Sequence, residues 1–216
     1  MTDRELQQHV QQALDWEPSV DAAEIGVSVD DGVVTLRGDV RTYSAKEAAE
    51  RVALRVYGVK AVANDIHVHL TEASARTDTD IAQAALAALK WNTRVPNEKI
   101  SLAVANGWIT LKGEVEWEYQ RLAAADTVRD LVGVLGITNS IIIVPHVSVS
   151  DVKSKIEAAL KRSAEIDARR INVTTVDGKV ILSGQVRSWL ERTEAWRAAW
   201  AAPGVRHVDD RMTIVP

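Results

Sequence analysis

The chain has no cysteine among its 216 residues and no uninterrupted apolar run of the length that crosses a bilayer. Without cysteine, disulfides, thiol catalysis and thiolate metal sites are all excluded. The N-terminus carries Asp3, Glu5 and several glutamines, where a secretory signal needs a basic start and an apolar core. We therefore expect a cytoplasmic protein without a transmembrane segment; a longer native N-terminus would leave a periplasmic or envelope location open.

The motifs of common catalytic sites are also missing. The sequence contains no G-x-S-x-G, G-x-x-x-x-G-K, H-E-x-x-H or G-x-G-x-x-G pattern. His67 and His69 are one residue apart and would share a strand face, but two imidazoles do not complete a metal site. We expect no catalytic residue, no metal site and no enzyme activity.

Three stretches of the chain repeat one pattern of glycines. They read GVVTLRGDV from Gly32, GWITLKGEV from Gly107 and GKVILSGQV from Gly178, offset by 75 and 71 residues. A Gly-Val pair follows each stretch at the same distance, which indicates three copies of one unit. We place them at residues 1–72, 73–146 and 147–216, with junctions in residues 71–80 and in Pro145–Asp151.

The hydrophobic period changes in the same order within each copy. Helical spacing comes first, with Asp3, Asp78 and Ser150 placed to cap the three opening helices. Two alternating segments around a turn such as Asp-Asp-Gly then predict a hairpin, and a second helix and a third strand follow. We predict an α+β fold of three tandem α-β-β-α-β units. In each, two helices pack on one face of a three-stranded mixed sheet.

These patterns resemble the BON domain family. The hairpin pattern G-x-V-T-L-x-G-x-V and the later strand pattern G-V-x-x-V-x-N-x-I-x-V occur from Gly32 and from Gly58, and both later copies match. The resemblance covers nearly the whole chain. It implies a non-catalytic binding module, often associated with phospholipid and with osmotic stress in bacteria. Some cytosolic relatives respond to potassium, so a potassium-binding protein is the alternative that the resemblance leaves open.

One polar position falls on the inward side of the third strand in every copy. It is Asn64, Asn139 and Asp210. A short polar side chain there is expected to bond free backbone groups in the neighbouring loop, which is a structural role and not a ligand site.

The copies differ in charge. The first has 7 basic and 13 acidic residues, the second 7 and 8, and the third 12 and 9. An acidic chain without basic residues interleaved with stacking aromatics is a poor candidate for nucleic acid. Weak attraction of the third copy to an anionic surface is compatible with this pattern.

Tryptophans gather on the second helix of the third copy. The spacing of Trp189, Trp196 and Trp200 puts them on one stripe, turned away from the alanines that face their own sheet. We interpret this stripe, with the flanking Arg192 and Arg197, as an interaction surface.

A second apolar patch is expected on the outer face of the second sheet, from Trp108, Ile142 and Val144. Two kinds of partner would cover these surfaces: another copy, subunit or protein, or an anionic phospholipid surface that the arginines would contact through its phosphates. No cofactor is expected, apart from potassium under the alternative function.

Overall fold

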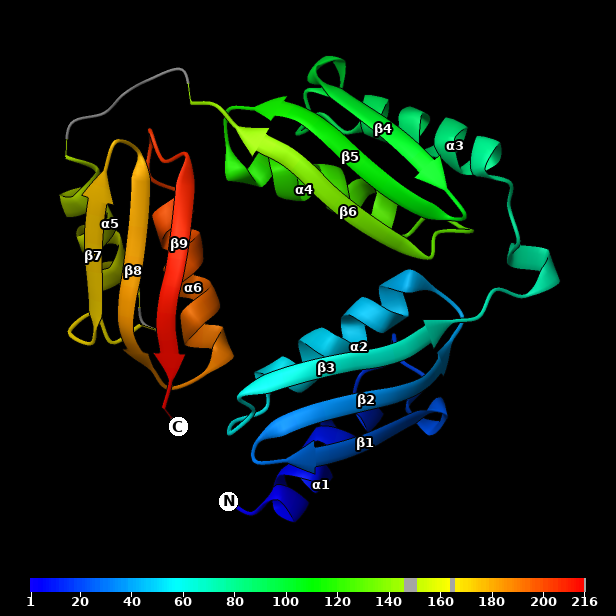
Figure 1. Cartoon of the computed structure of the whole chain (residues 1–216), viewed down its shortest axis with the longest axis horizontal. Helices are drawn as coiled ribbons and strands as arrows, with labels where there is room; N and C mark the ends of the chain where they lie inside the picture. Colours follow the sequence, from blue (N-terminus) through cyan, green and yellow to red (C-terminus); the bar gives the residue numbers. More distant parts are fainter. Residues whose placement is uncertain (146–150, 164–165, 216) are drawn as a thin grey trace. The chain divides into compact units, whose positions relative to one another are not determined.

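The computed structural model describes residues 1–145, 151–163 and 166–215, and each copy is a three-stranded sheet with two helices on one face (Figure 1). The first copy contains α1 (Asp3–Asp15), β1 (Ile25–Asp30), β2 (Val33–Val40), α2 (Tyr43–Arg55) and β3 (Ala61–Val68). The second contains α3 (Asp78–Trp91), β4 (Ile100–Ala105), β5 (Trp108–Val115), α4 (Glu118–Arg129) and β6 (Gly136–Ile143). The third contains α5 (Val152–Arg162), β7 (Ile171–Val176), β8 (Lys179–Val186), α6 (Trp189–Trp200) and β9 (His207–Ile214). Residues 146–150 of the second predicted junction lie outside the described residues.

The hairpin's second strand is the centre of every sheet. In the first copy β2 pairs antiparallel with β1 and parallel with β3, and β8 makes the same two pairings with β7 and β9. The strand order β4-β5-β6 repeats this arrangement in the second copy. The predicted α+β fold of three repeated units with mixed sheets is therefore confirmed.

A separate hydrophobic core fills the space between the helices and the sheet of each copy. Leu6, Val10 and Leu14 of α1 are buried against alternate residues of the strands, such as Val34 and Leu36. Burying one side chain of this size stabilises the fold by about 1.5–3 kcal/mol. A core this small sets where the helices lie and leaves their outer sides to solvent.

The hairpin turn holds two successive residues at positive φ. The φ angles are 48° and 79° at Asp31 and Gly32, and 47° and 79° at Asp177 and Gly178. This geometry matches the right-handed twist of the strands, and it favours Asn or Asp followed by Gly. The repeated glycine of the sequence pattern is thereby explained.

The opening helices are capped one residue earlier than predicted. The N-caps of α1 and α3 are Thr2 and Thr77, whose side chains accept hydrogen bonds from the amides of Glu5 and Asp80. Asp3 and Asp78 are instead the first helical residues, so the prediction that they cap these helices is wrong. The third predicted cap, Ser150, lies outside the described residues.

Both aspartates bind the hairpin turn of their own copy. The two carboxylate oxygens of Asp3 accept hydrogen bonds from the amides of Asp31 and Gly32, at 2.9 and 3.1 Å. In the second copy Asp78 accepts from Asn106 and Gly107, both at 2.8 Å. A carboxylate makes short, strong bonds with such amides, so it fixes the start of the helix over the turn.

The polar position of the third strand links that strand to the second helix. Asn139 Oδ1 accepts from the Ile141 amide at 3.2 Å, and its Nδ2 donates to the carbonyl of Arg121 in α4 at 2.8 Å. Asn64 makes the same two bonds, and Asp210 accepts from the Met212 amide at 3.0 Å. The expected partners in a loop were wrong: these side chains bond an amide of their own strand, and the two asparagines also bond a carbonyl of the second helix.

The contacts between residues divide the chain into two compact bodies: residues 1–114 with 119–142, and residues 115–118 with 143–216.

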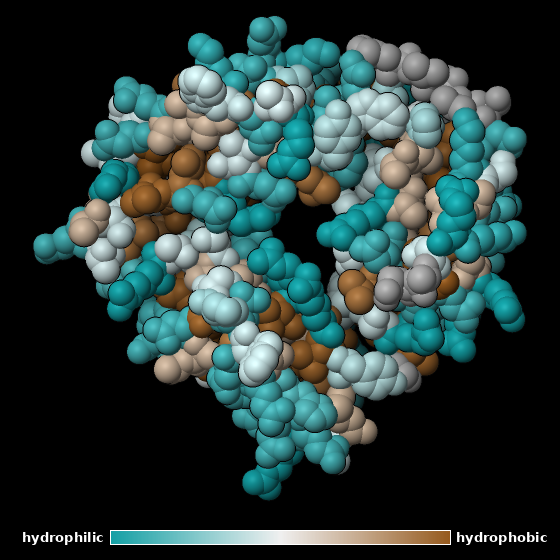
Figure 2. All heavy atoms as spheres, turned by 180° about the vertical axis from the view of Figure 1, so that it is seen from behind, coloured by the Kyte–Doolittle hydropathy of each residue, from teal (hydrophilic) through white to brown (hydrophobic). Residues whose placement is uncertain are grey.

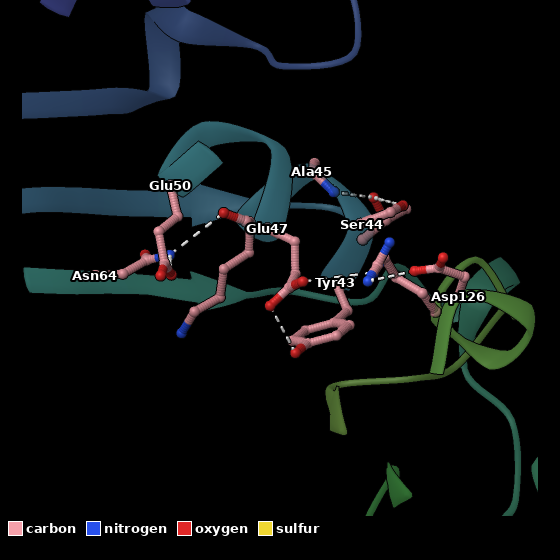
Figure 3. A network of polar contacts seen from close by, with 10 residues as sticks. Tyr43, Ser44, Ala45, Glu47, Glu50, Asn64 and Asp126 are labelled. Atoms are coloured by element: carbon pink, nitrogen blue, oxygen red, sulfur yellow. Dashed lines mark hydrogen bonds and ion pairs between the residues drawn. The ribbon is translucent and has the colours of Figure 1, made fainter. Parts of the chain in front are cut away.

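The first body contains a polar link between α2 and α4 (Figure 3). Glu47 faces Arg129 across this link, with Oε2 and Nε 3.4 Å apart, and Arg129 Nη2 lies 2.8 Å from Asp126 Oδ1. Tyr43 donates its hydroxyl proton to Glu47 at 2.9 Å. Burial, and then the negative charge of Glu47, raise the pKa of the Tyr43 phenol.

Replacing Asn139 by alanine should destabilise the second copy by about 1–3 kcal/mol, because the Ile141 amide loses its acceptor and β6 loses its bond to α4. Amide exchange of Ile141 in the native full chain, together with urea unfolding, measures the loss. The control is Ser140→Ala, an exposed neighbour on the same strand, expected to stay within about 0.5 kcal/mol of the parent. Equal effects of the two substitutions would contradict this role.

The raised pKa of Tyr43 predicts a loss of stability in alkali. Below pH of about 10 the phenol is neutral in both the folded and the unfolded chain. Above it the unfolded chain loses this proton first, so the free energy of unfolding falls by at most about 1.4 kcal/mol per pH unit from this group, and by less because solvent screens the half-buried phenol. In Tyr43→Phe the fall should be smaller. Urea midpoints measured from neutral to alkaline pH test this, and parallel curves for the two proteins would refute it.

Candidate interaction surfaces

The tryptophan stripe of α6 is only partly exposed. Trp189 and Trp196 are half-buried, while Trp200 is 8% exposed. The rings of Trp196 and Trp200 meet edge to face, with centroids 5.9 Å apart, a favourable arrangement for aromatic pairs. Trp200 also lines a cavity of about 270 Å³ together with Trp117 and Pro145, all within the second compact body. The interpretation of the stripe as an interaction surface stays a prediction.

Both arginines of this surface bind carboxylates of their own copy. Arg192 Nε lies 2.7 Å from Asp210 Oδ2, and its guanidinium carbon lies 4.7 Å from the centre of the Trp189 ring. Arg197 Nη1 lies 2.7 Å from Glu194 Oε1. A lipid phosphate would therefore have to compete with these two carboxylates for the guanidinium groups.

The second predicted patch is exposed on the sheet of the second copy. Trp108 is 48% exposed, Ile142 55% and Val144 40%. The Trp108 ring lies across Gly136 of β6, where an added Cβ would be 2.3 Å from the ring, and its Nε1 donates to Thr138 at 2.8 Å. The ring is thus held flat on the sheet.

The other two sheets carry charged pairs on the corresponding face. Arg37 and Asp65 lie 3.5 Å apart in the first copy, and Lys179 and Asp209 lie 3.4 Å apart in the third. The apolar outer face is thus a property of the second copy among the three described sheets.

Sequence reasoning missed the most exposed tryptophans of the described residues. Trp16 is 89% and Trp91 is 86% exposed, and the offset of 75 residues puts both at one position of the repeat, at the end of the opening helix. Arg162 takes this place in the third copy. The 75-residue spacing of the two tryptophans could have drawn attention to them. Helical periodicity alone, however, does not tell an exposed position next to the buried face of a helix from a buried one.

On the outer side of the opening helix, the residues in the two turns before this position differ between the copies. The residues one and two turns before are Ala87 and Ala84 in α3, Gln12 and His9 in α1, and Ala158 and Lys155 in α5. In α3 both alanines are exposed, and Figure 2 shows apolar side chains gathered over the part of the chain that carries this helix (upper left). Trp91 therefore ends an apolar row on the surface, whereas Trp16 follows polar residues.

Within residues 1–145, 151–163 and 166–215, no group of three or more metal-ligating side chains is close enough to hold a metal ion. His67 on β3 and His69 just after this strand are both exposed. Over the same ranges no helix is at once long and apolar enough to span a bilayer.

A relative of known name shares part of this sequence. The chain is 28% identical over 145 residues to Osmotically-inducible protein Y of Escherichia coli strain K12. The aligned region covers 65% of this chain and 72% of that protein. Among solved structures, it is similar to CdsD, a structural protein of the Type III secretion system of Chlamydia trachomatis, at 18% identity and a TM-score of 0.28 over 98% of this chain and 93% of that one. The PrgH periplasmic domain matches 89% of this chain and 96% of its own at 11% identity and a TM-score of 0.23.

The repeated unit itself matches a known domain. The sequence profile of the BON domain fits residues 2–69, 77–145 and 148–216, so that three successive matches cover nearly the whole chain. The chain belongs to the BON domain family, as three domains in tandem.

Proposed function

We propose that this chain is a non-catalytic, osmotic-stress-related binding protein that acts by contact with a phospholipid surface, and that its second copy makes this contact. The stress role is supported by the similarity to the osmotically inducible protein of E. coli. The contact is supported by the exposure of Trp91 at the end of the apolar row of α3.

The apolar row offers a large hydrophobic gain. A tryptophan side chain buries up to about 250 Å², and about 25 cal/mol per Å² makes its transfer from water worth at most roughly 6 kcal/mol. Ala84 and Ala87 extend the row by two helical turns. A helix that lies in the plane of a membrane interface buries such a row while its polar side stays in water.

Charge favours the second copy over the first for an anionic surface. Exposed Lys90 and Arg94 flank Trp91, and the whole second copy has only one more acidic than basic residue. Trp16 is flanked by Asp15 and Glu17 in the most acidic of the copies. Each basic residue close to an anionic membrane contributes about 1 kcal/mol of attraction, and acidic residues oppose it.

The exposed patch of Trp108, Ile142 and Val144 adds a second apolar surface to the same copy. It lies on the sheet, whereas α3 packs on the other face, so a flat membrane would not cover both at once. Protein contact or self-association through this patch is compatible with membrane contact through α3.

Flotation with vesicles of phosphatidylcholine alone, or mixed with phosphatidylglycerol, tests the proposal. The full chain should float with the anionic vesicles, and Trp91→Ala should reduce the bound fraction about tenfold or more, because one large apolar anchor is lost. Trp16→Ala is the matched control: the same residue at the same repeat position, equally exposed, with the bound fraction unchanged.

Other outcomes would move or remove the contact. Binding that survives Trp91→Ala but is lost in Trp196→Ala would return it to the stripe of the third copy. The absence of flotation with either vesicle would contradict a lipid function and leave contact with proteins.

A further inference from the structure

The hairpin turns of the first two copies are carboxylate-binding sites that are already filled. In each turn two successive amides point at one aspartate of the same copy, with the four bonds between 2.8 and 3.1 Å. Consecutive amides in such a turn form a small concave site for an anion. The fold thus shows twice that this turn binds an oxyanion.

The third copy has the same turn without the aspartate. Leu6, Ile81 and Val152 share one position of the opening helix, so the position of Asp3 and Asp78 falls on Val149, outside the described residues. No acidic residue occurs between residues 144 and 150. The φ angles of Asp177 and Gly178 match those of the filled turns to within about 5°. Among the described residues, none accepts a hydrogen bond from the amide of Asp177 or of Gly178. The turn's own strand pairing joins Val176 and Lys179.

A cationic side chain lies beside this open turn. The Arg206 side chain passes Gly178, with its Cγ 3.3 Å from where a Cβ would stand, and the Arg206 amide donates to the Gly178 carbonyl at 2.8 Å. Its guanidinium has no carboxylate partner among the residues that the structure describes. The same position holds Lys60, which pairs with Asp31 at 3.2 Å, in the first copy, and Leu135 in the second.

The neighbouring charges do not fill the site. Lys179 follows the turn but pairs with Asp209 at 3.4 Å, and Asp209 also binds Arg211 at 2.9 Å. Asp177 itself is exposed and adds one negative charge to the turn. Basic residues outnumber acidic ones in the third copy, 12 to 9, the reverse of the first copy, so the surrounding field favours an anion.

We propose that the amides of Asp177 and Gly178, together with the Arg206 guanidinium, bind an oxyanion of the phosphate class that comes from outside the chain. Two oxygens would occupy the places that the carboxylate oxygens take in the other copies, and a third would face Arg206. Guanidinium and backbone amides are both strong donors to phosphate oxygens. The source is either free phosphate or a phospholipid headgroup, and this site does not depend on contact through Trp91.

Amide NMR of the full chain, titrated with inorganic phosphate against a matched chloride series, tests the site. The signals of Asp177 and Gly178 should move and saturate. The amides of Gly32 and Gly107 serve as controls within the same molecule, and they should not move because aspartates occupy them. No shift at Gly178, or equal shifts at all three glycines, would overturn the proposal.

Substitutions at or beside the turns should change which turns bind phosphate. Arg206→Glu reverses the charge beside the third turn and should abolish the phosphate response of Gly178. Arg206→Ala should weaken it about tenfold, by the loss of one charge-assisted bond. Asp78→Ala should make Gly107 respond, more weakly than Gly178 because Leu135 stands where Arg206 does. A response of Gly178 unchanged in Arg206→Glu would contradict the assignment.

The source of the phosphate is decided by replacing the salt with vesicles that contain phosphatidylglycerol. Loss of the Gly178 signal on vesicles in the wild type, but not in Arg206→Glu, assigns the site to a lipid headgroup. A response to inorganic phosphate alone assigns it to the free ion. Vesicle binding that persists in Arg206→Glu but fails in Trp91→Ala would support the proposed function, and the titration with inorganic phosphate would then decide the phosphate site alone.

Discussion

Every copy of the domain depends on a hairpin turn that holds two successive residues at positive φ. Such a turn demands a glycine and turns two amides outward, where they need an acceptor. In two copies the first residue of the opening helix supplies it, and the helix is thereby fixed over the sheet. The same constraint that makes the sequence repeat visible also creates an anion site wherever the aspartate is missing.

The fold could be predicted from sequence because its signals are local and occur three times. Glycine spacing located the copies, and the change of hydrophobic period gave the order of elements. Side-chain partners were harder to foresee. Asp3 and Asp78 were expected to cap helices, and Asn139 to bond a loop, because capping and turn preferences are local rules. The turn amides lie 28 and 29 residues from their aspartates, and the Arg121 carbonyl lies 18 residues from Asn139, so only the packed structure decides these partners.

The candidate surfaces were foreseen less completely. Helical spacing placed the alanines of α6 toward their own sheet, where Ala195 and Ala199 are buried, and the sheet period indicated the exposure of Trp108 and Ile142. The sequence periodicity did not indicate that Arg192 would pair with Asp210, or that Trp91 would be almost fully exposed at the end of α3. Periodicity describes one element at a time, whereas ion pairing and exposure depend on neighbouring elements and on where a helix ends. The residues that differ between the copies therefore needed the structure.

The three copies share one fold, and we propose that the outer side of α3 makes the membrane contact. Because the chain has no cysteine, single nitroxide labels can be placed at the equivalent positions of the three opening helices, in Gln12→Cys, Ala87→Cys and Ala158→Cys. Electron paramagnetic resonance then measures the access of oxygen and of a water-soluble relaxing agent to each label on anionic vesicles. The account predicts that only the label at position 87 gains oxygen access and loses access from water. A label at position 158 that changes instead, or three labels that change alike, would contradict it.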